Sequence, residues 1–346
     1  MSHKVEELVK HLAPEDDVRH LRSEVERLKK ALSDRKKDSG LISESMVEVL
    51  AAIEEAKPTP LVYKTPKSLK VERPVVLVAH ATDWHIGEVV QPEHVEEFGS
   101  ANFALAQARV EKFAGNLIRS AELARASYAV PTLHVVGTAD WVSGGIHEEL
   151  IRTNEFPEPV QAVKSGYLLG AFIERLAPHF ESVVVDVLPA GNHDRITRKP
   201  QASEGALNSW GYVVGKIAEQ YVSRLRNVKY RLHVGLSTVI EVNGRRYLIA
   251  HGDGIQGTWG IPYYGIERQK QKEAMARMNM DASKHFDKIV IGHFHSALDH
   301  EHWMIGGSLT GTNAFDHKCG RHSRPHQTSW FVHPEHGEFG FTRWWL

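Results

Sequence analysis

Five segments of the chain pair a short apolar run, of the kind that forms a buried strand, with a polar turn just after it. The turns read Asp83-Trp84-His85, Asp140, Asn192-His193-Asp194, His251 and Gly292-His293-Phe294-His295. Side chains that follow buried strands gather in a crevice where the strands end. The pattern therefore predicts a fold in which distant parts of the chain meet at one end of a sheet.

The stretches between these turns predict a mixed α/β fold. Strand-type runs lie at 75–79, 133–136, 183–188, 239–242, 247–250 and 288–291, and helix-type stretches at 103–128, 159–176 and 204–225. Asn243-Gly244 between two strand-type runs predicts a hairpin. Further short strand-type runs at 328–332 and 338–342 predict antiparallel strands. Helices among the early strands and hairpins among the later ones indicate a sandwich of two sheets flanked by helices.

The first 74 residues differ from the rest. Residues 1–56 are polar and favour helix, and residues 57–74 form a linker rich in proline and lysine. Apolar residues in the first segment recur at spacings of three and four, namely Val18, Leu21, Val25, Leu28 and Leu32. This seam is typical of a coiled coil, but it is shorter than roughly three to four heptads. An arm that forms a homo-oligomer and a helix that folds back onto its own domain both remain open.

Composition limits the compartment and the partners. The net charge of −1 over 346 residues provides no general attraction to nucleic acid or to an anionic membrane. The only cysteine, Cys319, excludes an internal disulfide and a cysteine-rich zinc site. The N-terminus lacks the apolar core of a signal peptide, and no apolar run approaches the roughly 20 residues that cross a bilayer. We therefore expect a cytoplasmic protein without a membrane partner.

The residue types in the five turns are ligands for catalytic divalent metals. Imidazole and oxygen donors leave a cation acidic and able to exchange water, which thiolate donors do less well. Alternation along an extended chain places Asp83 and His85 on the same side, and His293 and His295 share this spacing. Two ions roughly 3.5–4 Å apart, joined by a shared carboxylate, would form a centre able to act on a phosphate ester.

The order of the five turns resembles that of the calcineurin-like metallophosphoesterase superfamily. The resemblance spans about residues 77–295 and rests on Asp-x-His, Asp, Gly-Asn-His-Asp, His and Gly-His-x-His in that order. The tail at 307–313 and 324–328 resembles phage and bacterial members described as DNA-repair-exonuclease-like. The resemblance implies that residues 75–346 form a four-layer αββα metallophosphoesterase domain.

The resemblance also implies a role for each residue of the turns. Most would bind two divalent metal ions: Asp83, His85 and His295 one ion, Asn192, His251 and His293 the other, and Asp140 both. The ions would be Mn, Fe, Zn or Ni, among which these ligands do not choose. A water molecule activated by both ions would attack phosphorus. His193 would be the catalytic group that faces the leaving oxygen, and Asp194 would orient His193.

Other residues near the turns allow two interpretations each. Arg195 and His147 are candidates for substrate binding, although a solvated loop explains them as well. Trp84 and Trp141 each follow a ligand Asp and could stack on a nucleobase, although packing around the ligands is favoured. Ala139 replaces the glycine that the family has at this position. Its methyl group could crowd the neighbouring ligands or shift the bridging carboxylate.

We expect a metal-dependent phosphoric ester hydrolase that prefers phosphodiesters, with a nucleic acid or a nucleotide as the favoured substrate. The preference follows from the phage-like tail and not from charge. A small-molecule phosphomonoesterase is the first alternative. An assembly or scaffold protein with a vestigial metal site is the second, motivated by Ala139 and by the coiled-coil-like first segment.

Overall fold

The computed structural model describes residues 74–200, 205–255 and 260–346. The expected arm at 1–56, its role in oligomerisation and the linker up to residue 73 lie outside the described residues. In this described part, no helix is both long enough and apolar enough to cross a membrane.

Two β-sheets organise the described residues. The six-stranded sheet has the order β11-β10-β1-β2-β3-β4, and the five-stranded sheet has the order β5-β6-β7-β9-β8. The strands of the first are β1 (Val76–Ala81), β2 (Thr132–Thr138), β3 (Ser182–Leu188), β4 (Val228–Leu232), β10 (His326–His333) and β11 (Gly337–Trp345). Those of the second are β5 (Ser237–Val242), β6 (Arg245–Ala250), β7 (Lys288–Ile291), β8 (Leu298–Asp299) and β9 (Trp303–Ile305).

Helices accompany the sheets along the chain. The longer ones are α3 (Phe103–Ala124), α5 (Glu158–Leu176), α6 (Trp210–Val222) and α7 (Tyr263–Arg277). Shorter ones are η1 (Pro92–Val95), α4 (Glu148–Thr153), η2 (Ala177–His179), η3 (Ala282–Lys284) and α8 (Ala314–Lys318). Asn102 and Ser209 cap α3 and α6 through side-chain oxygens that accept backbone N–H groups. The caps explain why both helices begin where they do.

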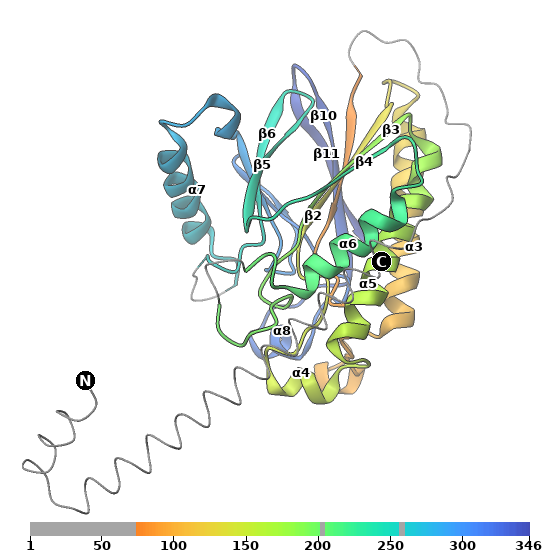
Figure 1. The fold of residues 1–346 in the computed structure, drawn as a ribbon, viewed down its shortest axis with the longest axis vertical. Helices are drawn as coiled ribbons and strands as arrows, with labels where there is room; N and C mark the ends of the chain where they lie inside the picture. The colour runs from red at the N-terminus through yellow and green to blue at the C-terminus, as the bar shows by residue number, and fades with distance from the viewer. Residues whose placement is uncertain (1–73, 201–204, 256–259) are drawn as a thin grey trace, which may run out of the picture. The chain divides into compact units, whose positions relative to one another are not determined.

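The sheets face each other across an apolar core, with helices on their outer sides (Figure 1). Val78, Val136 and Trp330 of the first sheet belong to the same buried cluster as Ile249 and Val290 of the second. The helices α3, α5 and α6 lie together beside the six-stranded sheet (Figure 1). On the five-stranded sheet, Ile266 of α7 packs with Leu248, Ile289 and Ile291. The sequence-based expectation of two sheets with flanking helices is confirmed.

Local signals in the sequence account for two features of the sheets. Asn243 and Gly244 both have positive φ angles, 51° and 85°, as the tight turn between β5 and β6 requires. The C-terminal strands β10 and β11 pair antiparallel, and β10 adds to the parallel strands through β1. Gln327 secures this junction, because its side chain accepts the N–H of Thr82 and donates to the carbonyl of Thr82, each at 2.9 Å.

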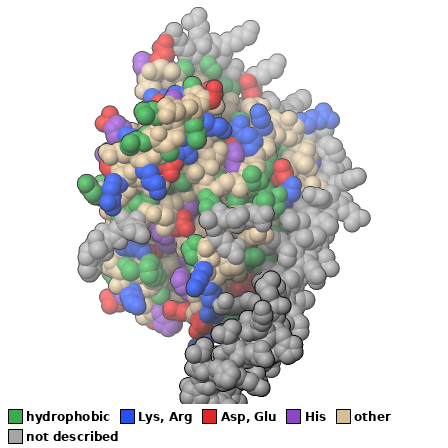
Figure 2. Space-filling view, turned by 60° about the vertical axis from the view of Figure 1, so that its left-hand side comes forward, with side chains coloured by type: hydrophobic (Ala, Val, Ile, Leu, Met, Phe, Trp, Pro, Cys, Tyr) green, Lys and Arg blue, Asp and Glu red, His purple; other side chains and the backbone are tan. Residues whose placement is uncertain are grey.

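The surface carries no field of a single sign on the face shown in Figure 2. Basic, acidic and apolar side chains are interspersed there among the described residues. This mixture agrees with the net charge of −1.

One buried charge ties three neighbouring strands together. Asp186 of β3 is fully buried and accepts hydrogen bonds from His134 of β2 at 2.7 Å and from Arg231 of β4 at 2.6 Å. The ring of His233 lies 2.7 Å from the same carboxylate. Burial raises the pKa of Asp186, but the three partners together lower it by more than burial raises it. The pKa therefore lies well below its usual range. Asp186 is therefore an ionised acceptor that fixes the edge of the six-stranded sheet.

Replacing this charge should destabilise the domain. We expect Asp186→Asn to lower the free energy of unfolding by about 1–3 kcal/mol, because it weakens several charge-assisted hydrogen bonds. Since the pKa of Asp186 is lowered, the stabilisation is fully present above the usual carboxyl pKa of about 3.9 and is lost as the pH falls below it. Urea denaturation at pH 7 measures the difference. The control is Glu111→Gln, which breaks an exposed pair with Arg175 and should change little; equal effects would contradict the prediction.

Candidate metal centre

The five polar turns meet where strands of both sheets end. Asp83 follows β1, Asp140 follows β2 and Asn192 comes after β3, all in the six-stranded sheet. His251 follows β6 and His293 follows β7 in the five-stranded sheet. Both layers of the sandwich therefore contribute side chains to one site, which explains how residues more than 200 positions apart come into contact.

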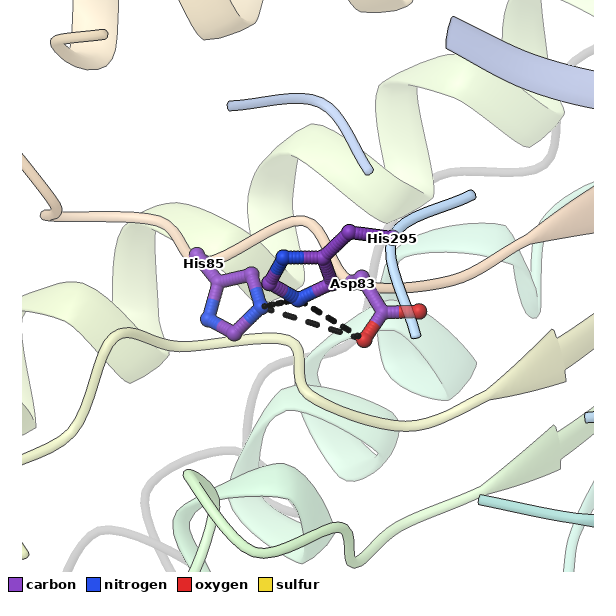
Figure 3. A group of neighbouring side chains, drawn as sticks. All are labelled: Asp83, His85 and His295. Atoms are coloured by element: carbon purple, nitrogen blue, oxygen red, sulfur yellow. Dashed lines mark hydrogen bonds and ion pairs between the residues drawn. The ribbon is translucent and has the colours of Figure 1, made fainter. Parts of the chain in front are cut away.

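The first group of ligand atoms belongs to Asp83, His85 and His295 (Figure 3). The Nε2 atoms of His85 and His295 lie 3.0 Å apart. Asp83 Oδ1 lies 3.8 Å from the first of these nitrogens and 3.5 Å from the second. All three side chains are buried. Two imidazole nitrogens and a carboxylate oxygen aimed at one buried point form a donor set that suits a divalent cation.

The second group contains Asp140, Asn192, His251 and His293. Asn192 Oδ1 lies 3.1 Å from His251 Nε2 and 3.0 Å from His293 Nδ1. Asp140 Oδ2 lies 2.9 Å from His251 Nε2. These donors are again oxygen and imidazole nitrogen, so the residues present fit a second divalent cation.

Asp140 connects the two groups. Ligand atoms of Asp140, His251 and His293 lie within 4.8 Å of one another, and so do those of Asp140, His85 and His193. The structure thus brings together every residue that the sequence analysis named as a ligand. Their binding of metal remains a prediction.

Most of the ligand residues have a strained backbone. Asp83, Asp140 and His293 have φ angles of 51°, 53° and 69°, in the left-handed region. This conformation costs roughly 1–2 kcal/mol for each residue with a side chain. Strain of this kind persists where the surrounding structure imposes it, and it clusters at functional sites. Here it turns each side chain away from its strand and toward the centre.

Two glycines leave room for the carboxylates. A Cβ atom on Gly191 would lie 2.1 Å from Asp140 Oδ1, and one on Gly292 would lie 2.4 Å from Asp83 Oδ2. No side chain fits at these distances. Gly-Asn-His-Asp and Gly-His-x-His therefore begin with glycine because each backbone passes directly against a carboxylate of another turn.

The electrostatics of the centre also suit a cation. Burial raises the pKa of Asp83, but contacts with His295 and His85 hold it well below its usual range. Burial lowers the pKa of His251, but Asp140 raises it to about 10, so without metal this ring carries a proton that a cation would have to displace. Burial and the charge on His251 lower the pKa of His293 to about 3, so this imidazole is neutral and offers a lone pair. Ionised carboxylates and a neutral imidazole are the states in which these groups bind metals.

His193 lies beside both groups but is held differently. Its Nδ1 lies 2.8 Å from the carbonyl oxygen of Ser143, and its ring centroid lies 4.5 Å from that of His85. Its backbone N–H donates to Asp140 Oδ1 at 2.9 Å. Because a carbonyl can only accept, Nδ1 carries a proton, and Nε2 is left as the titrating atom. Burial lowers the pKa of His193.

The hydrogen-bond partners of Asp194 differ from those that the sequence predicted. Its carboxylate accepts the backbone N–H groups of Asp140 at 2.7 Å, Trp141 at 2.9 Å and Gly191 at 3.0 Å. The Ser143 carbonyl, and not Asp194, holds the ring of His193. Asp194 is fully buried and fixes the two turns that carry Asp140 and Asn192.

The remaining candidates divide between the edge of the site and the core. His147 is exposed, with its ring centroid 6.1 Å from that of His193. Arg195 is partly buried, and its Nε donates to the carbonyl oxygen of Asn192 at 3.0 Å. Trp84 and Trp141 are buried and pack edge to face with centroids 5.3 Å apart. Their packing role is confirmed, and stacking on a nucleobase is excluded by their burial.

Two acidic residues beside the metal-ligand candidates were not predicted from the sequence. Asp316 Oδ2 lies 2.6 Å from His295 Nδ1, and Glu88 Oε2 lies 3.9 Å from His85 Nδ1. The one feature of the sequence that could have drawn attention to Asp316 is the start of the short helix α8. Asn313 caps this helix by accepting the Asp316 N–H at 2.9 Å. A cap predicts a helix start but not what the helix touches, so only the structure shows these contacts.

Ala139 combines a strained backbone with a buried methyl group. Its φ angle is 73°, and its side chain belongs to the apolar cluster between the sheets, together with Val136 and Leu188. The methyl group thus takes part in core packing. Glycine would relieve the strain at this position but would leave the packing incomplete.

We expect Ala139→Gly to change the free energy of unfolding by less than about 1 kcal/mol. Relief of roughly 1–2 kcal/mol of strain is offset by the loss of a buried methyl group, about 0.8 kcal/mol, and by greater freedom of the unfolded chain. Ala139→Val should cost at least about 2 kcal/mol, because a β-branched residue is disfavoured at positive φ and overpacks the core. Urea denaturation of both variants measures this, and a tolerated valine would contradict it.

Comparisons with protein-family models and with curated proteins each gave no match. Among solved structures, a variant of Vps29 from Entamoeba histolytica is 12% identical, with 78% of this chain and 98% of that chain covered and a TM-score of 0.29. A purple acid phosphatase from yellow lupin is 12% identical, with 73% and 34% covered and a TM-score of 0.28. An uncharacterized predicted phosphoesterase from Streptococcus pneumoniae is 10% identical, with 52% and 90% covered and a TM-score of 0.25. Likenesses of this size assign neither a family nor a function.

Proposed function

We propose that the protein is a metallophosphoesterase that holds two divalent metal ions and hydrolyses phosphodiesters. The observation that carries the proposal is the position of the Asp140 carboxylate between two clusters of ligand atoms. One cluster includes His85, and the other includes His251 and His293. Asp83, His85 and His295 would hold one ion, and Asn192, His251 and His293 the other. The ions would supply Lewis acidity, which polarises the phosphoryl group and acidifies water.

The protein's own residues would position the reacting groups. Asp194 holds the backbone of the Asp140 turn through the N–H groups of Asp140 and Trp141. This hydrogen bonding fixes the shared carboxylate without occupying its oxygens. The buried donors are thus preorganised, which reduces the reorganisation needed during the reaction.

His193 would handle the proton on the leaving oxygen. Its Nδ1 is committed to the Ser143 carbonyl, so Nε2 is the atom that can gain and release a proton. An anionic phosphate beside the ring favours its protonated form and offsets the effect of burial on the pKa. His193 would then donate from Nε2 as the bond to the leaving group breaks.

The limited positive charge beside His193 favours a diester over a monoester. Arg198 pairs with Glu148 at 3.0 Å. Arg195 donates from Nε to a backbone carbonyl, while its Nη1 has no hydrogen-bond partner within the described part of the chain and is left to contact a single phosphate charge. A monoester carries about −1.5 to −2 charges at neutral pH and a diester only one, so a diester needs fewer free cations. The net charge of −1 favours a nucleotide or a locally bound strand over long nucleic acid held by a basic field. His147 and Arg195 at the edge of the site would contact this substrate.

The substrate class can be tested with chromogenic esters. With Mn²⁺, we expect faster turnover of bis-p-nitrophenyl phosphate than of p-nitrophenyl phosphate. Asp140→Asn should lower the rate at least about 100-fold, because both ions lose a shared charge. The control is Glu111→Gln, which removes a carboxylate from an exposed pair with Arg175 on the helix α3 and should leave the rate unchanged.

Three results would contradict the proposal in different ways. A preference for the monoester would make the protein a phosphomonoesterase. An unaffected Asp140→Asn would remove the shared-ligand role. A wild-type protein without metal or turnover would support a scaffold with a vestigial site.

The role of His193 predicts a dependence on the leaving group. We expect His193→Ala to lower the rate on a dinucleotide by about 10²–10⁴-fold, since an alkoxide is a poor leaving group without a proton. The loss on bis-p-nitrophenyl phosphate should be much smaller, because p-nitrophenolate leaves without protonation. Steady-state rates on both substrates measure the ratio. An equal loss on both would show that His193 does not serve as the proton donor.

A further inference from the structure

The histidines of the Asp83 group each turn their second ring nitrogen toward a buried carboxylate. His295 Nδ1 lies 2.6 Å from Asp316 Oδ2, and Asp316 is 2% exposed. His85 Nδ1 lies 3.9 Å from Glu88 Oε2, and Glu88 is 7% exposed. Among the described residues, neither His85 Nδ1 nor Glu88 Oε2 has a hydrogen-bond partner. Two buried polar atoms that face each other without partners indicate an unfinished contact.

Asn313 joins the two carboxylates. Its Nδ2 donates to Glu88 Oε1 at 2.9 Å, and its Oδ1 accepts the backbone N–H of Asp316 at 2.9 Å. Arg321 contacts the other carboxylate oxygen of Asp316, with Nη2 at 3.1 Å from Oδ1. Glu88, Asn313 and Asp316 thus form one buried unit, which we call the outer bracket. It contacts His295 directly and faces His85 across a gap of 3.9 Å.

In the second group of donors, the outer nitrogen of His251 faces an uncharged partner. His251 Nδ1 lies 2.9 Å from the carbonyl oxygen of Thr138, which is uncharged. Asn192 offers this group an amide oxygen, where the first group has the carboxylate of Asp83. A carboxylate on the outer nitrogen makes an imidazole a stronger donor than a carbonyl does, and it fixes the ring. The two groups therefore differ in how strongly they should hold a cation.

We propose that Glu88 and Asp316 are positioning residues that act through His85 and His295, and that the outer bracket makes the Asp83 group the first of the two to fill. The inference rests on the proposed two-metal function. The gap of 3.9 Å between His85 Nδ1 and Glu88 Oε2 is longer than a hydrogen bond, and its closure when metal binds is part of the proposal. Closing the contact would satisfy the two orphaned atoms and lock the His85 ring.

The test is a metal titration of stripped, full-length protein by calorimetry, with Zn²⁺ and a competing chelator. We expect the wild type to bind in two steps of different affinity. Glu88→Gln and Asp316→Asn should each weaken the tighter step about 10–100-fold and leave the weaker step unchanged. Glu88→Gln keeps the shape of the side chain, which guards against misfolding. Glu111→Gln, a carboxylate lost from an exposed pair on α3, is the matched control and should titrate like the wild type.

One equivalent of Co²⁺ provides a second readout. Its absorption spectrum reports the ligands of the first site to fill, so Glu88→Gln and Asp316→Asn should alter it and Glu111→Gln should not. A purely structural role would instead lower the melting temperature of the metal-free protein and weaken both steps alike, which would overturn the inference.

The outcomes also separate this inference from the proposed function. If the wild type binds two ions and hydrolyses a phosphodiester while both variants titrate normally, the outer bracket has no such role and the proposed function stands. If the wild type binds no ion, both are wrong.

Discussion

The site is organised by the burial of several ionisable groups around the Asp140 carboxylate. Asp140 is 1% exposed, and His251 Nε2 lies 2.9 Å from its Oδ2, while the His193 N–H donates to its Oδ1. Removing such charges from water costs several kcal/mol each unless partners compensate. The carboxylates and imidazoles from five turns compensate one another in part, and two divalent cations would complete the balance. The rest of the domain serves to hold these groups at this place.

The sandwich is suited to this purpose because two sheets end at the same place. A single sheet would supply donors from one layer only. Here the turns after β1, β2 and β3 meet those after β6 and β7, and Gly191 and Gly292 let the backbones pass against the opposing carboxylates. The left-handed residues Asp83, Asp140 and His293 are the strained points of this arrangement. Core packing, as at Ala139, and buried hydrogen bonds, as at Asp194, hold that strain in place.

Short-range patterns predicted much of this. Apolar runs, helix periodicity and the Asn243-Gly244 turn located the main elements, and the order of the polar turns named the donors that the structure brings together. Long-range contacts could not be read in the same way. Asp194 turns inward to accept backbone N–H groups, so the ring of His193 depends on the Ser143 carbonyl. Asp316 reaches His295 only because α8 folds against it, which no local spacing reveals.

Anomalous diffraction from crystals soaked with Mn²⁺ or Zn²⁺ would locate the ions themselves. We expect two peaks on either side of the Asp140 carboxylate, about 3.5–4 Å apart. One peak would lie among Asp83, His85 and His295, and the other among Asn192, His251 and His293. Peaks elsewhere, or none at saturating metal, would contradict the two-metal centre.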